Sequence, residues 1–500
     1  MSLPTVVTSA VGVVAFLAAG WLGSGRVPSR SGRPHGRVTG PGGSGPGPRG
    51  RPGAGAVWAG RGDLASLTVR RDRSGTTPPG RLVLGRAGRR LVVAERAQSV
   101  IVFGPTQSLK TSGFAVPALL EWSGPVVAAS VKTDLVDHTV SFRRAGGEVQ
   151  CFDPSGSTGM VSASWSPLAS SRTWPAARRA AAGLTEVARS SVGTMADGDF
   201  WYATATKMLA PLLFAAASGG GDMGDVIRWV DTHEEAEVLD LLGAAGVPEA
   251  LHAAWSAFGK EERQRSSIYT TVETVLEPFA LDAAPTPEGT ERSTVDPARL
   301  LDGNNTLYLC APAHDQRRLA PLFVSVVRQI LEHAYDRVTM THGPLDPPLL
   351  VVLDEAANIA PLADLDTLAA TAAGHGVQLV TVWHDLAQIT ARFGARATTV
   401  VNNHRAKLFL SGISDPSTLD YASHLIGEEE VLLPATTRGG RHGTSTTRSP
   451  TTRRLAPPDA LRRIEPSHAV LVYGDLPPIR LRLRPWFADP VLGARARGSP

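Results

Sequence analysis

Short apolar runs rich in Val, Ile and Leu recur along much of the chain. Such runs, bounded by polar or turn-forming residues, are typical of strands that are buried on both faces of a parallel sheet. Segments compatible with helices follow several of them, and this alternation predicts an α/β fold with a parallel central sheet. The predicted strands are Ser99–Phe103, Pro125–Ala129, Glu148–Phe152, Thr306–Cys310, Pro348–Leu353 and Val377–Trp383.

The middle of the chain has a different pattern. Between Trp174 and Arg292 the strand-like runs stop, and Ala-rich segments of mixed charge favour helices. The sequence therefore predicts an all-α domain inserted into the α/β domain. The predicted helices are Pro175–Ser190, Phe200–Ala217 and Val226–Ala245. The expected boundaries are 57–174 and 296–490 for the two parts of the α/β domain, 175–295 for the insertion and 491–500 for a tail.

The C-terminal region begins with a polar stretch. After Pro434 the sequence TTRGGRHGTSTTRSPTTRR predicts a mobile loop. Two further strands are predicted at His468–Tyr473 and Ile479–Arg484, followed by a short Arg-containing tail.

The N-terminus is apolar. No charged residue precedes Arg26, and Thr5–Leu22 approaches the length of a membrane span, so we expect a transmembrane anchor over residues 1–22. A Gly/Pro/Arg-rich linker, residues 23–56, follows it, either as a solvated tether or with its Arg side chains near anionic lipid. The Arg cluster after the apolar run predicts a single-pass protein of the inner (cytoplasmic) membrane with the bulk of the chain in the cytoplasm. The alternative is a cleaved or non-spanning apolar segment.

The overall charge does not indicate a broadly basic protein. The formal net charge is +4, but residues 1–56 hold six Arg and no acidic residue. The remainder has 44 basic and 46 acidic residues, a net charge of −2, so a high isoelectric point does not by itself indicate nucleic-acid binding. Only five of the basic residues are Lys. Cys151 and Cys310 lie in apolar runs without metal-ligand spacing, which supports neither a disulfide framework nor a zinc site.

The sequence SVIVFGPTQSLKTS carries the sharpest chemical signal. A strand that leads through a Gly-started loop into a helix turns backbone N–H groups and a helix N-terminus toward one point, which suits nucleotide phosphates. Lys110 adds a cation, and Thr111 adds a hydroxyl for Mg²⁺. Leu109 stands where this motif normally has its second Gly, and the alternative interpretation is an ordinary βα turn. The predicted nucleotide-binding residues are Gly104, Pro105, Thr106, Gln107, Ser108, Leu109, Lys110, Thr111 and Ser112.

An acidic pair follows a later strand. In PPLLVVLDEA, Asp354 is expected to hold the Mg²⁺ shell and Glu355 to polarise an attacking water. Asp and Glu also favour helix N-termini, so a capped helix start is the alternative. Together with Lys110 the pair predicts an NTPase that uses Mg²⁺.

His384 is a third candidate. It follows the predicted strand Val377–Trp383, where side chains at strand carboxyl ends face the ligand crevice of α/β sheets. It is expected either to sense the γ-phosphate or relay to DNA, or to be a surface or helix-capping His.

The ordered set of segments resembles the TraG-like coupling proteins of type IV secretion and conjugation, which are RecA-like and FtsK-like P-loop ATPases. The resemblance covers about Gly80 to Asp489 and rests on GRLVLGRAGRRLVV, GPTQSLKTS, VVAASVKTDLVDHTVSFRRAGGEVQCFDPSG, VVLDEAANIAPL and PPDALRRIEPSHAVLVYGDLPPIRLRLRPWFAD. It implies a RecA-like fold with an all-α insertion that recruits substrate, and the roles given above for Lys110, Thr111, Asp354 and Glu355. The resemblance also matches Lys132 to a Lys that the family has after its second strand. The alternative is that Lys132 is a solvated turn residue.

The sequence departs from the family in three places. The family's Arg in a turn after the acidic strand is replaced by Ala372, Ala373 and His375, and His384 replaces a Gln. One predicted membrane helix stands where the family commonly has two. The candidates to replace the missing Arg are Arg392, Arg396 and Arg405.

Three functions follow from this reading. The first is a membrane-anchored ATPase, a homo-hexameric ring that translocates single-stranded DNA or a relaxase–DNA conjugate to type IV secretion components. The second is an adaptor that binds nucleotide, hydrolyses it weakly and docks cargo. The third is an FtsK-type pump of double-stranded DNA, against which the absence of a recognisable C-terminal winged-helix segment weighs.

Overall fold

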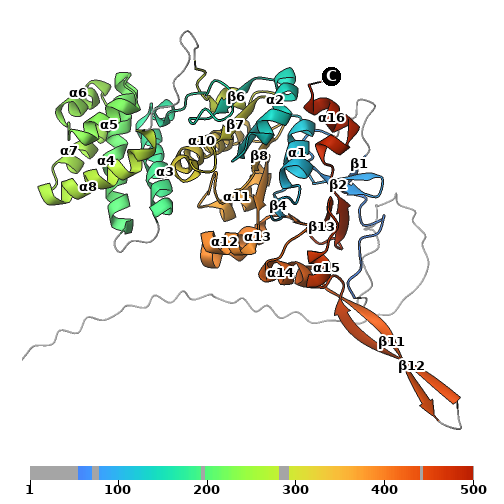
Figure 1. Cartoon of the computed structure of the whole chain (residues 1–500). Coiled ribbons are helices and arrows are strands. Elements are labelled where there is room, and N and C mark those ends of the chain that lie inside the picture. The colour runs from blue at the N-terminus through green and yellow to red at the C-terminus, as the bar shows by residue number, and fades with distance from the viewer. Residues whose placement is uncertain (1–54, 70–77, 193–197, 281–291, 440–442, 499–500) are drawn as a thin grey trace, which may run out of the picture. The chain divides into compact units, whose positions relative to one another are not determined.

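A twelve-stranded mixed sheet is the central element of the fold (Figure 1). The computed structural model describes residues 55–69, 78–192, 198–280, 292–439 and 443–498. The predicted membrane anchor and most of the linker lie outside these residues. No helix among the described residues is both long enough and apolar enough to span a membrane. In spatial order the strands are β1 (Thr68–Val69), β3 (Arg90–Val93), β2 (Val83–Ala87), β14 (Ile479–Arg482), β13 (His468–Tyr473), β10 (Ala406–Leu410), β4 (Val100–Phe103), β9 (Val377–Trp383), β8 (Leu349–Leu353), β5 (Val126–Ser130), β7 (Thr306–Cys310) and β6 (Val149–Phe152).

The seven strands from β10 to β6 are parallel to one another, which confirms the predicted α/β class with a parallel central sheet. The remaining five strands, from β13 to β1, form an antiparallel extension. All six runs predicted as core strands are strands, and β7 and β9 have the predicted bounds. Their continuous apolar sequence is explained by burial, because both faces of the parallel region are covered.

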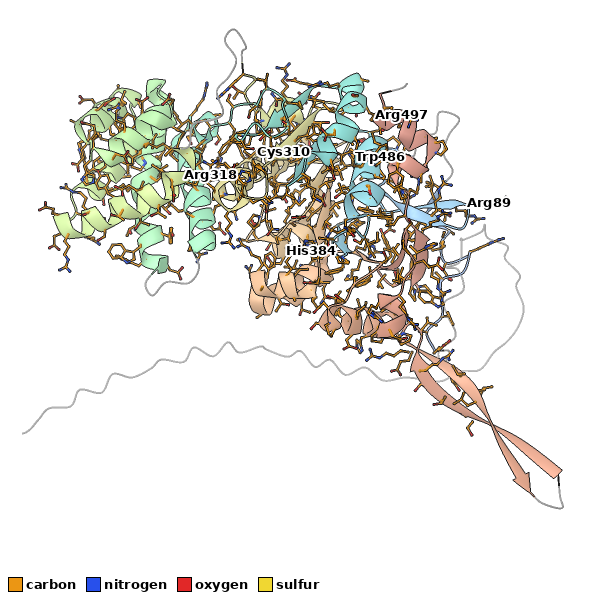
Figure 2. The ribbon with its side chains drawn as sticks, in the orientation of Figure 1. Arg89, Cys310, Arg318, His384, Trp486 and Arg497 are labelled. Atoms are coloured by element: carbon orange, nitrogen blue, oxygen red, sulfur yellow. The ribbon has the colours of Figure 1, made fainter. Side chains whose placement is uncertain are left out.

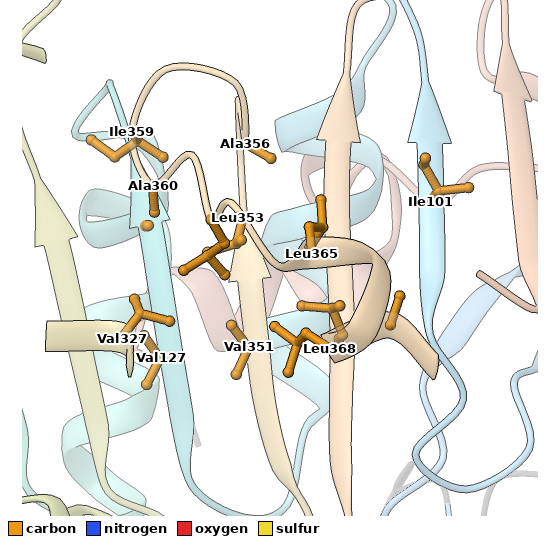
Figure 3. Packing of buried hydrophobic residues seen from close by; sticks show 14 of the residues in the cluster. Ile101, Val127, Val327, Val351, Leu353, Ala356, Ile359, Ala360, Leu365 and Leu368 are labelled. Carbon is orange, nitrogen blue, oxygen red and sulfur yellow. The ribbon is translucent and has the colours of Figure 1, made fainter. Parts of the chain in front are cut away.

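Alternate residues of each parallel strand enter different cores. In β4, Val100 and Val102 face one helix layer and Ile101 and Phe103 face the other. Figure 3 shows the second core around Leu353, the last residue of β8. The first layer contains α1 (Val116–Glu121), α2 (Asp134–Gly146) and α16 (Pro490–Ala496). The second contains α10 (Gln316–Thr341), α11 (Leu365–Thr371), α12 (Leu386–Phe393), α13 (Ala397–Asn403), α14 (Pro416–Ile426) and α15 (Pro458–Arg462).

The Ala-rich middle of the chain is helical, as predicted, and has its own hydrophobic core. The predicted helix over Val226–Ala245 is wrong in one respect, because it is broken into two. His233 adopts a left-handed φ of +52°, and the Glu234 side chain accepts hydrogen bonds from the backbone N–H groups of the next helix. The helices are α3 (Trp174–Val192), α4 (Gly198–Gly219), α5 (Met223–Asp231), α6 (Ala236–Ala245), α7 (Pro248–Phe258) and α8 (Glu262–Leu276), and α9 (Pro297–Leu300) leads back to the sheet.

Two C-terminal predictions are also corrected. The polar stretch after Pro434 is not a loop but part of a two-stranded antiparallel ribbon, β11 (Glu428–Gly439) and β12 (Gly443–Arg454). Its Thr residues are compatible with strands. The tail predicted at 491–500 instead contributes most of α16, where Leu492 is fully buried.

A buried ion cluster anchors α16. Arg484 donates to Glu121 Oε2 at 2.6 Å and to Asp489 Oδ2 at 2.9 Å, and all three side chains are almost fully buried. Asp489 also caps α16 by accepting from Val491 N. The end of the chain is thereby joined to α1, the helix that follows the candidate phosphate loop.

Candidate nucleotide-binding site

The loop Gly104–Lys110 connects the buried strand β4 to a helical segment at the carboxyl edge of the sheet. The Gly104 N–H donates to Trp383 O at 3.0 Å, which ties the loop to β9. The Ser108 hydroxyl donates to Pro105 O at 2.8 Å and closes the loop on itself. The helical segment starts with a π-helical turn, Thr111–Ala115, which continues into α1. Such turns are rare and occur frequently at functional sites.

Leu109 adopts the backbone conformation that a glycine would supply. Its φ is +67°, and Gln107 in the same loop has a φ of +64°. An L-residue held in this left-handed region costs about 1–2 kcal/mol. The Leu109 side chain is half-buried and packs against the core beneath α1, and this contact offsets part of the strain. The loop therefore keeps a left-handed backbone conformation at this position, although Leu109 replaces the usual glycine.

Lys110, the last residue of the loop, is buried. Its Nζ lies 2.7 Å from Gly104 O, 3.2 Å from Pro105 O and 3.0 Å from His384 Nδ1. Burial lowers the pKa of Lys110, while the charges of Asp354 and Glu355 act in the opposite direction. The loop thus holds a cation whose present acceptors are two carbonyls and an imidazole.

His384, labelled in Figure 2, follows β9 directly. Burial, and then the charge of Lys110, lower the pKa of His384, so the ring is neutral at pH 7. An ammonium group only donates hydrogen bonds, so Nδ1 accepts from Lys110 and the ring proton is on Nε2. His384 therefore contacts the loop and keeps one ring N–H to offer, while the N-cap of α12 is its neighbour Asp385.

The side chains of Thr111 and Asp354 contact each other at the carboxyl edge of the sheet. The Thr111 hydroxyl donates to Asp354 Oδ2 at 2.7 Å, although 243 positions separate the two residues. Asp354 is 4% exposed, and its Oδ1 is buried without a hydrogen-bond partner. Desolvation raises the pKa of Asp354 to about 6. A buried carboxylate oxygen without a partner is costly unless a ligand completes its environment.

These two oxygen donors fit Mg²⁺. This ion is usually held by one or two protein oxygens together with phosphate oxygens and water, rather than by a cage of side chains. No group of three or more His, Cys, Asp or Glu side chains able to hold a metal occurs in the described part of the chain. The site thus has the donor set for a Mg²⁺ that arrives with phosphates.

Glu355 is the half-buried neighbour of Asp354. Its φ is +66°, a left-handed value that is uncommon for a non-glycine residue and clusters at functional sites. Asn358 Nδ2 donates weakly to Glu355 Oε2 at 3.4 Å, and the Glu355 charge raises the pKa of Lys110. A carboxylate in this position is suited to accept a proton from water near the loop.

Lys132 also belongs to this neighbourhood. It is exposed just after β5. Its charge adds to the lowering of the Lys110 pKa and opposes the rise of the Asp354 pKa.

Gln388 is a contact that the sequence reasoning missed: its Oε1 accepts from the His384 backbone N–H at 3.0 Å. The sequence D-L-A-Q, in which Asp385 caps the Gln388 N–H at 2.8 Å, resembles a capping box and offered a signal for it.

The substitutes for the missing Arg are all engaged within the chain. Arg392 donates to Pro361 O at 2.9 Å, and Arg396 pairs with Asp366 at 3.2 Å. Arg405 pairs with Glu95 at 2.9 Å. Because Arg405 precedes β10 while the loop follows β4, and these strands are parallel, Arg405 lies at the opposite edge of the sheet from Lys110.

The fold and the loop define a mixed α/β protein with a large parallel sheet and a strand–loop–helix turn at its carboxyl edge. Residues 58–498 match the family described as Type IV secretory system Conjugative DNA transfer, and the chain belongs to this family.

Curated relatives have related descriptions, and solved structures share the fold. The chain is 24% identical over 461 residues to the conjugal transfer protein TraG of Escherichia coli, covering 80% of this chain and 68% of TraG. It is 24% identical to the protein VirD4 of Rhizobium radiobacter, covering 81% and 59%. The chain thus spans about three fifths to two thirds of these relatives. The fold is similar to that of the plasmid coupling protein TrwB in complex with ADP and Mg²⁺ (TM-score 0.62, 18% identity, covering 89% and 96%). A TrwB complex with a non-hydrolysable ATP analogue gives 0.63 and 19%, covering 89% and 96%.

Proposed function

We propose that this protein is a coupling ATPase with a RecA-like motor domain, which binds ATP and Mg²⁺ at the loop Gly104–Ser112. The observation that carries the proposal is the hydrogen bond from Thr111, the residue after Lys110, to the buried carboxylate of Asp354. The structures of TrwB with nucleotides support it, since that protein has the same fold.

Each side chain of the site has a proposed role. Lys110 exchanges its carbonyl contacts for nucleotide phosphate oxygens, because an ammonium is better satisfied by an anion than by neutral acceptors. Thr111 and Asp354 would hold Mg²⁺, which when bound neutralises developing phosphate charge. Glu355 would accept the proton of the attacking water, and the Nε2–H of His384 would report on the terminal phosphate.

The motor would act on DNA. We propose that it recruits single-stranded DNA or a relaxase–DNA conjugate and moves it to a type IV secretion channel, as a homo-hexamer anchored by Thr5–Leu22 in the inner membrane. Membership of the conjugative DNA transfer family supports the DNA cargo and the secretion partner. In a ring, an Arg from a neighbouring subunit would complete the site, and Arg392 and Arg396 remain the proposed candidates.

The test is ATP turnover by the full-length chain in detergent, with and without single-stranded DNA. Turnover stimulated by DNA and lost in both Lys110→Ala and Glu355→Gln is expected. Glu262→Gln, an exposed carboxylate on α8, is the matched control and should retain turnover. Undiminished turnover in Glu355→Gln would exclude the proposed chemistry.

A second candidate function has its own support in Leu109. The strain at φ +67° and the side chain at this position could restrict the approach of phosphates to the loop. The protein would then be an adaptor that binds nucleotide to assemble, hydrolyses it weakly and docks cargo. Lys110-dependent ATP binding without measurable turnover would favour this function over the motor.

A further inference from the structure

A cavity of about 890 Å³ lies in the helical insertion, away from the nucleotide site. Helices α3, α4 and α7 supply most of its lining, and these helices are shown in green in Figure 1. Ala210 and Ala257, both buried, give it an apolar floor. Trp174, half-buried and packed edge-to-face on Phe214, forms part of the wall. The size lies in the range of sites that take small molecules or short peptide segments.

The rim of this cavity is cationic. Arg178 and Arg179 come from α3, Lys207 comes from α4, and Lys260 follows α7, while Glu249 is the one carboxylate in the lining. The two lysines are two of only five in the whole chain. Four cations against one acid give the cavity a net positive charge, although the chain beyond residue 56 is slightly acidic overall.

These cations lack the carboxylate partners that neighbouring arginines have. Among the described residues none of the four forms a direct ion pair, although the charge of Arg179 also acts on Glu332. In the same helical region Arg189 pairs with Asp199 at 2.8 Å, Arg228 with Glu237 at 3.0 Å and Arg265 with Glu235 at 3.2 Å. Like charges gathered without counter-charges repel one another, and a ligand of opposite charge relieves that repulsion.

We propose that this cavity binds an acidic peptide segment of a partner protein. The carboxylates would pair with Lys207, Lys260 and Arg178 at the rim, and small apolar side chains between them would contact the alanine floor. This combination of an apolar centre and a charged rim is the usual anatomy of a protein–peptide contact.

A nucleic-acid strand fits the cavity less well. Single strands are held by a continuous basic groove with several aromatic platforms for successive bases. Here Trp174 is the one aromatic residue in the lining, and its ring already packs against Phe214. The compact volume and the alanine floor therefore favour a peptide.

Describing this peptide as part of a transported or docking partner rests on the proposed coupling function, but the binding itself does not. The helices that form the cavity contain neither Lys110 nor Asp354, so binding is expected without nucleotide. Peptide binding with no ATP turnover would count against the proposed motor only. Normal turnover with no peptide binding would count against this inference only.

The experiment uses fluorescence anisotropy with the full-length chain in detergent at low salt. The probe is a labelled peptide of about twelve residues with alternating Glu and Leu, and its partner has Gln in place of every Glu. We expect the Glu peptide to bind and the Gln peptide to bind at least about tenfold more weakly. The double variant Lys207→Gln/Lys260→Gln should weaken binding of the Glu peptide about tenfold, since two cation–carboxylate contacts are each worth up to about a factor of five.

Matched controls separate a specific site from general charge. Arg263→Gln/Arg462→Gln removes the same two charges from exposed positions outside the cavity and should leave binding unchanged. Melting temperatures of all variants establish that they fold, and the single variant Lys207→Gln at an exposed position provides the measurement if the double variant does not. Equal binding of both peptides, or no loss in the Lys variants, would overturn the site. Displacement of the peptide by an oligothymidylate that binds in the same Lys207-dependent manner would overturn the peptide as its occupant.

Discussion

Lys110 Nζ lies 3.0 Å from His384 Nδ1, so the cation of the phosphate loop is held by the side chain at the end of the neighbouring strand. Strands β4 and β9 are adjacent and parallel, with Phe103 paired to Trp383, and the residues that follow them meet at one edge. The protonation state of His384 therefore affects how Lys110 is held when no nucleotide is bound.

The first prediction concerns the pH dependence of this contact. Because the folded state lowers the pKa of His384 below its ordinary value of 6.5, the unfolded chain binds the proton more readily. The resulting stability is present above pH 6.5 and is lost as the pH falls through the folded pKa. His384→Gln keeps an acceptor for Lys110 but does not titrate. We therefore expect the free energy of unfolding to fall less steeply below pH 6.5 in this variant.

The buried His404 provides the comparison for that measurement. Burial lowers its pKa to about 4, so it contributes to the same acid loss of stability in both proteins. Urea titrations at several pH values between 4 and 7.5 would reveal the difference between the native chain and His384→Gln. Parallel curves would contradict a titrating role for His384.

Asp354 gives a prediction of opposite sign. Its pKa is raised from 3.8 to about 6, so stability from its protonated form is complete below pH 3.8 and is lost as the pH rises through 6. Without nucleotide, the ionised Asp354 at pH 8 costs up to roughly 3 kcal/mol. Asp354→Asn should therefore raise the free energy of unfolding by roughly 1–3 kcal/mol at pH 8 and by little at pH 4.

Nucleotide affinity should move in the other direction. Asp354→Asn is expected to lose Mg²⁺-dependent binding of ATP, measured by calorimetry, because a neutral amide is a poorer ligand for the ion. Asp240→Asn, an exposed carboxylate on α6, should change neither property. A stabilisation of Asp354→Asn that is equal at both pH values would refute the linkage.

Leu109 allows the backbone strain to be measured. Leu109→Ala and Leu109→Gly both remove the packing of the side chain, but only glycine adopts φ +67° without strain. We expect Leu109→Gly to be more stable than Leu109→Ala by about 1 kcal/mol in urea unfolding. An exposed helical position such as Ala182 should show the reverse order when Ala is replaced by Gly, since helices disfavour glycine.

The Arg484 cluster predicts a large loss of stability. Arg484→Met leaves Glu121 and Asp489 buried without this cation and should cost about 3–5 kcal/mol, seen in the unfolding midpoint. Adding Glu121→Gln should recover part of the loss, so that the two changes are not additive. Additive losses would mean that the two side chains are not energetically coupled. Arg463→Met, at an exposed ion pair with Asp459, should cost less than about 1 kcal/mol.

Much of the fold was predictable from local pattern. The strands of the parallel sheet are short apolar runs between turns, and this pattern follows from burial on both faces. The loop from Gly104 to Thr111 and the acidic pair after β8 were predicted as one site from their places at strand ends. The ribbon β11–β12 and the helix α16 were missed, because polar Thr-rich strands and a short Arg-containing helix lack the periodicity that identifies them.

The sequence by itself determined which residue types stand at the ends of β4, β8 and β9, since one apolar run and its following residues suffice to show that. Only the tertiary structure decided that Thr111 bonds Asp354, that Lys110 bonds His384, and that Leu109 takes a left-handed conformation. It also decided that Lys207 of α4 and Lys260, which follows α7, line one cavity. The physical reason is that strand order in a sheet and packing between helices are set by contacts between segments far apart in the chain, which no local pattern of side chains encodes.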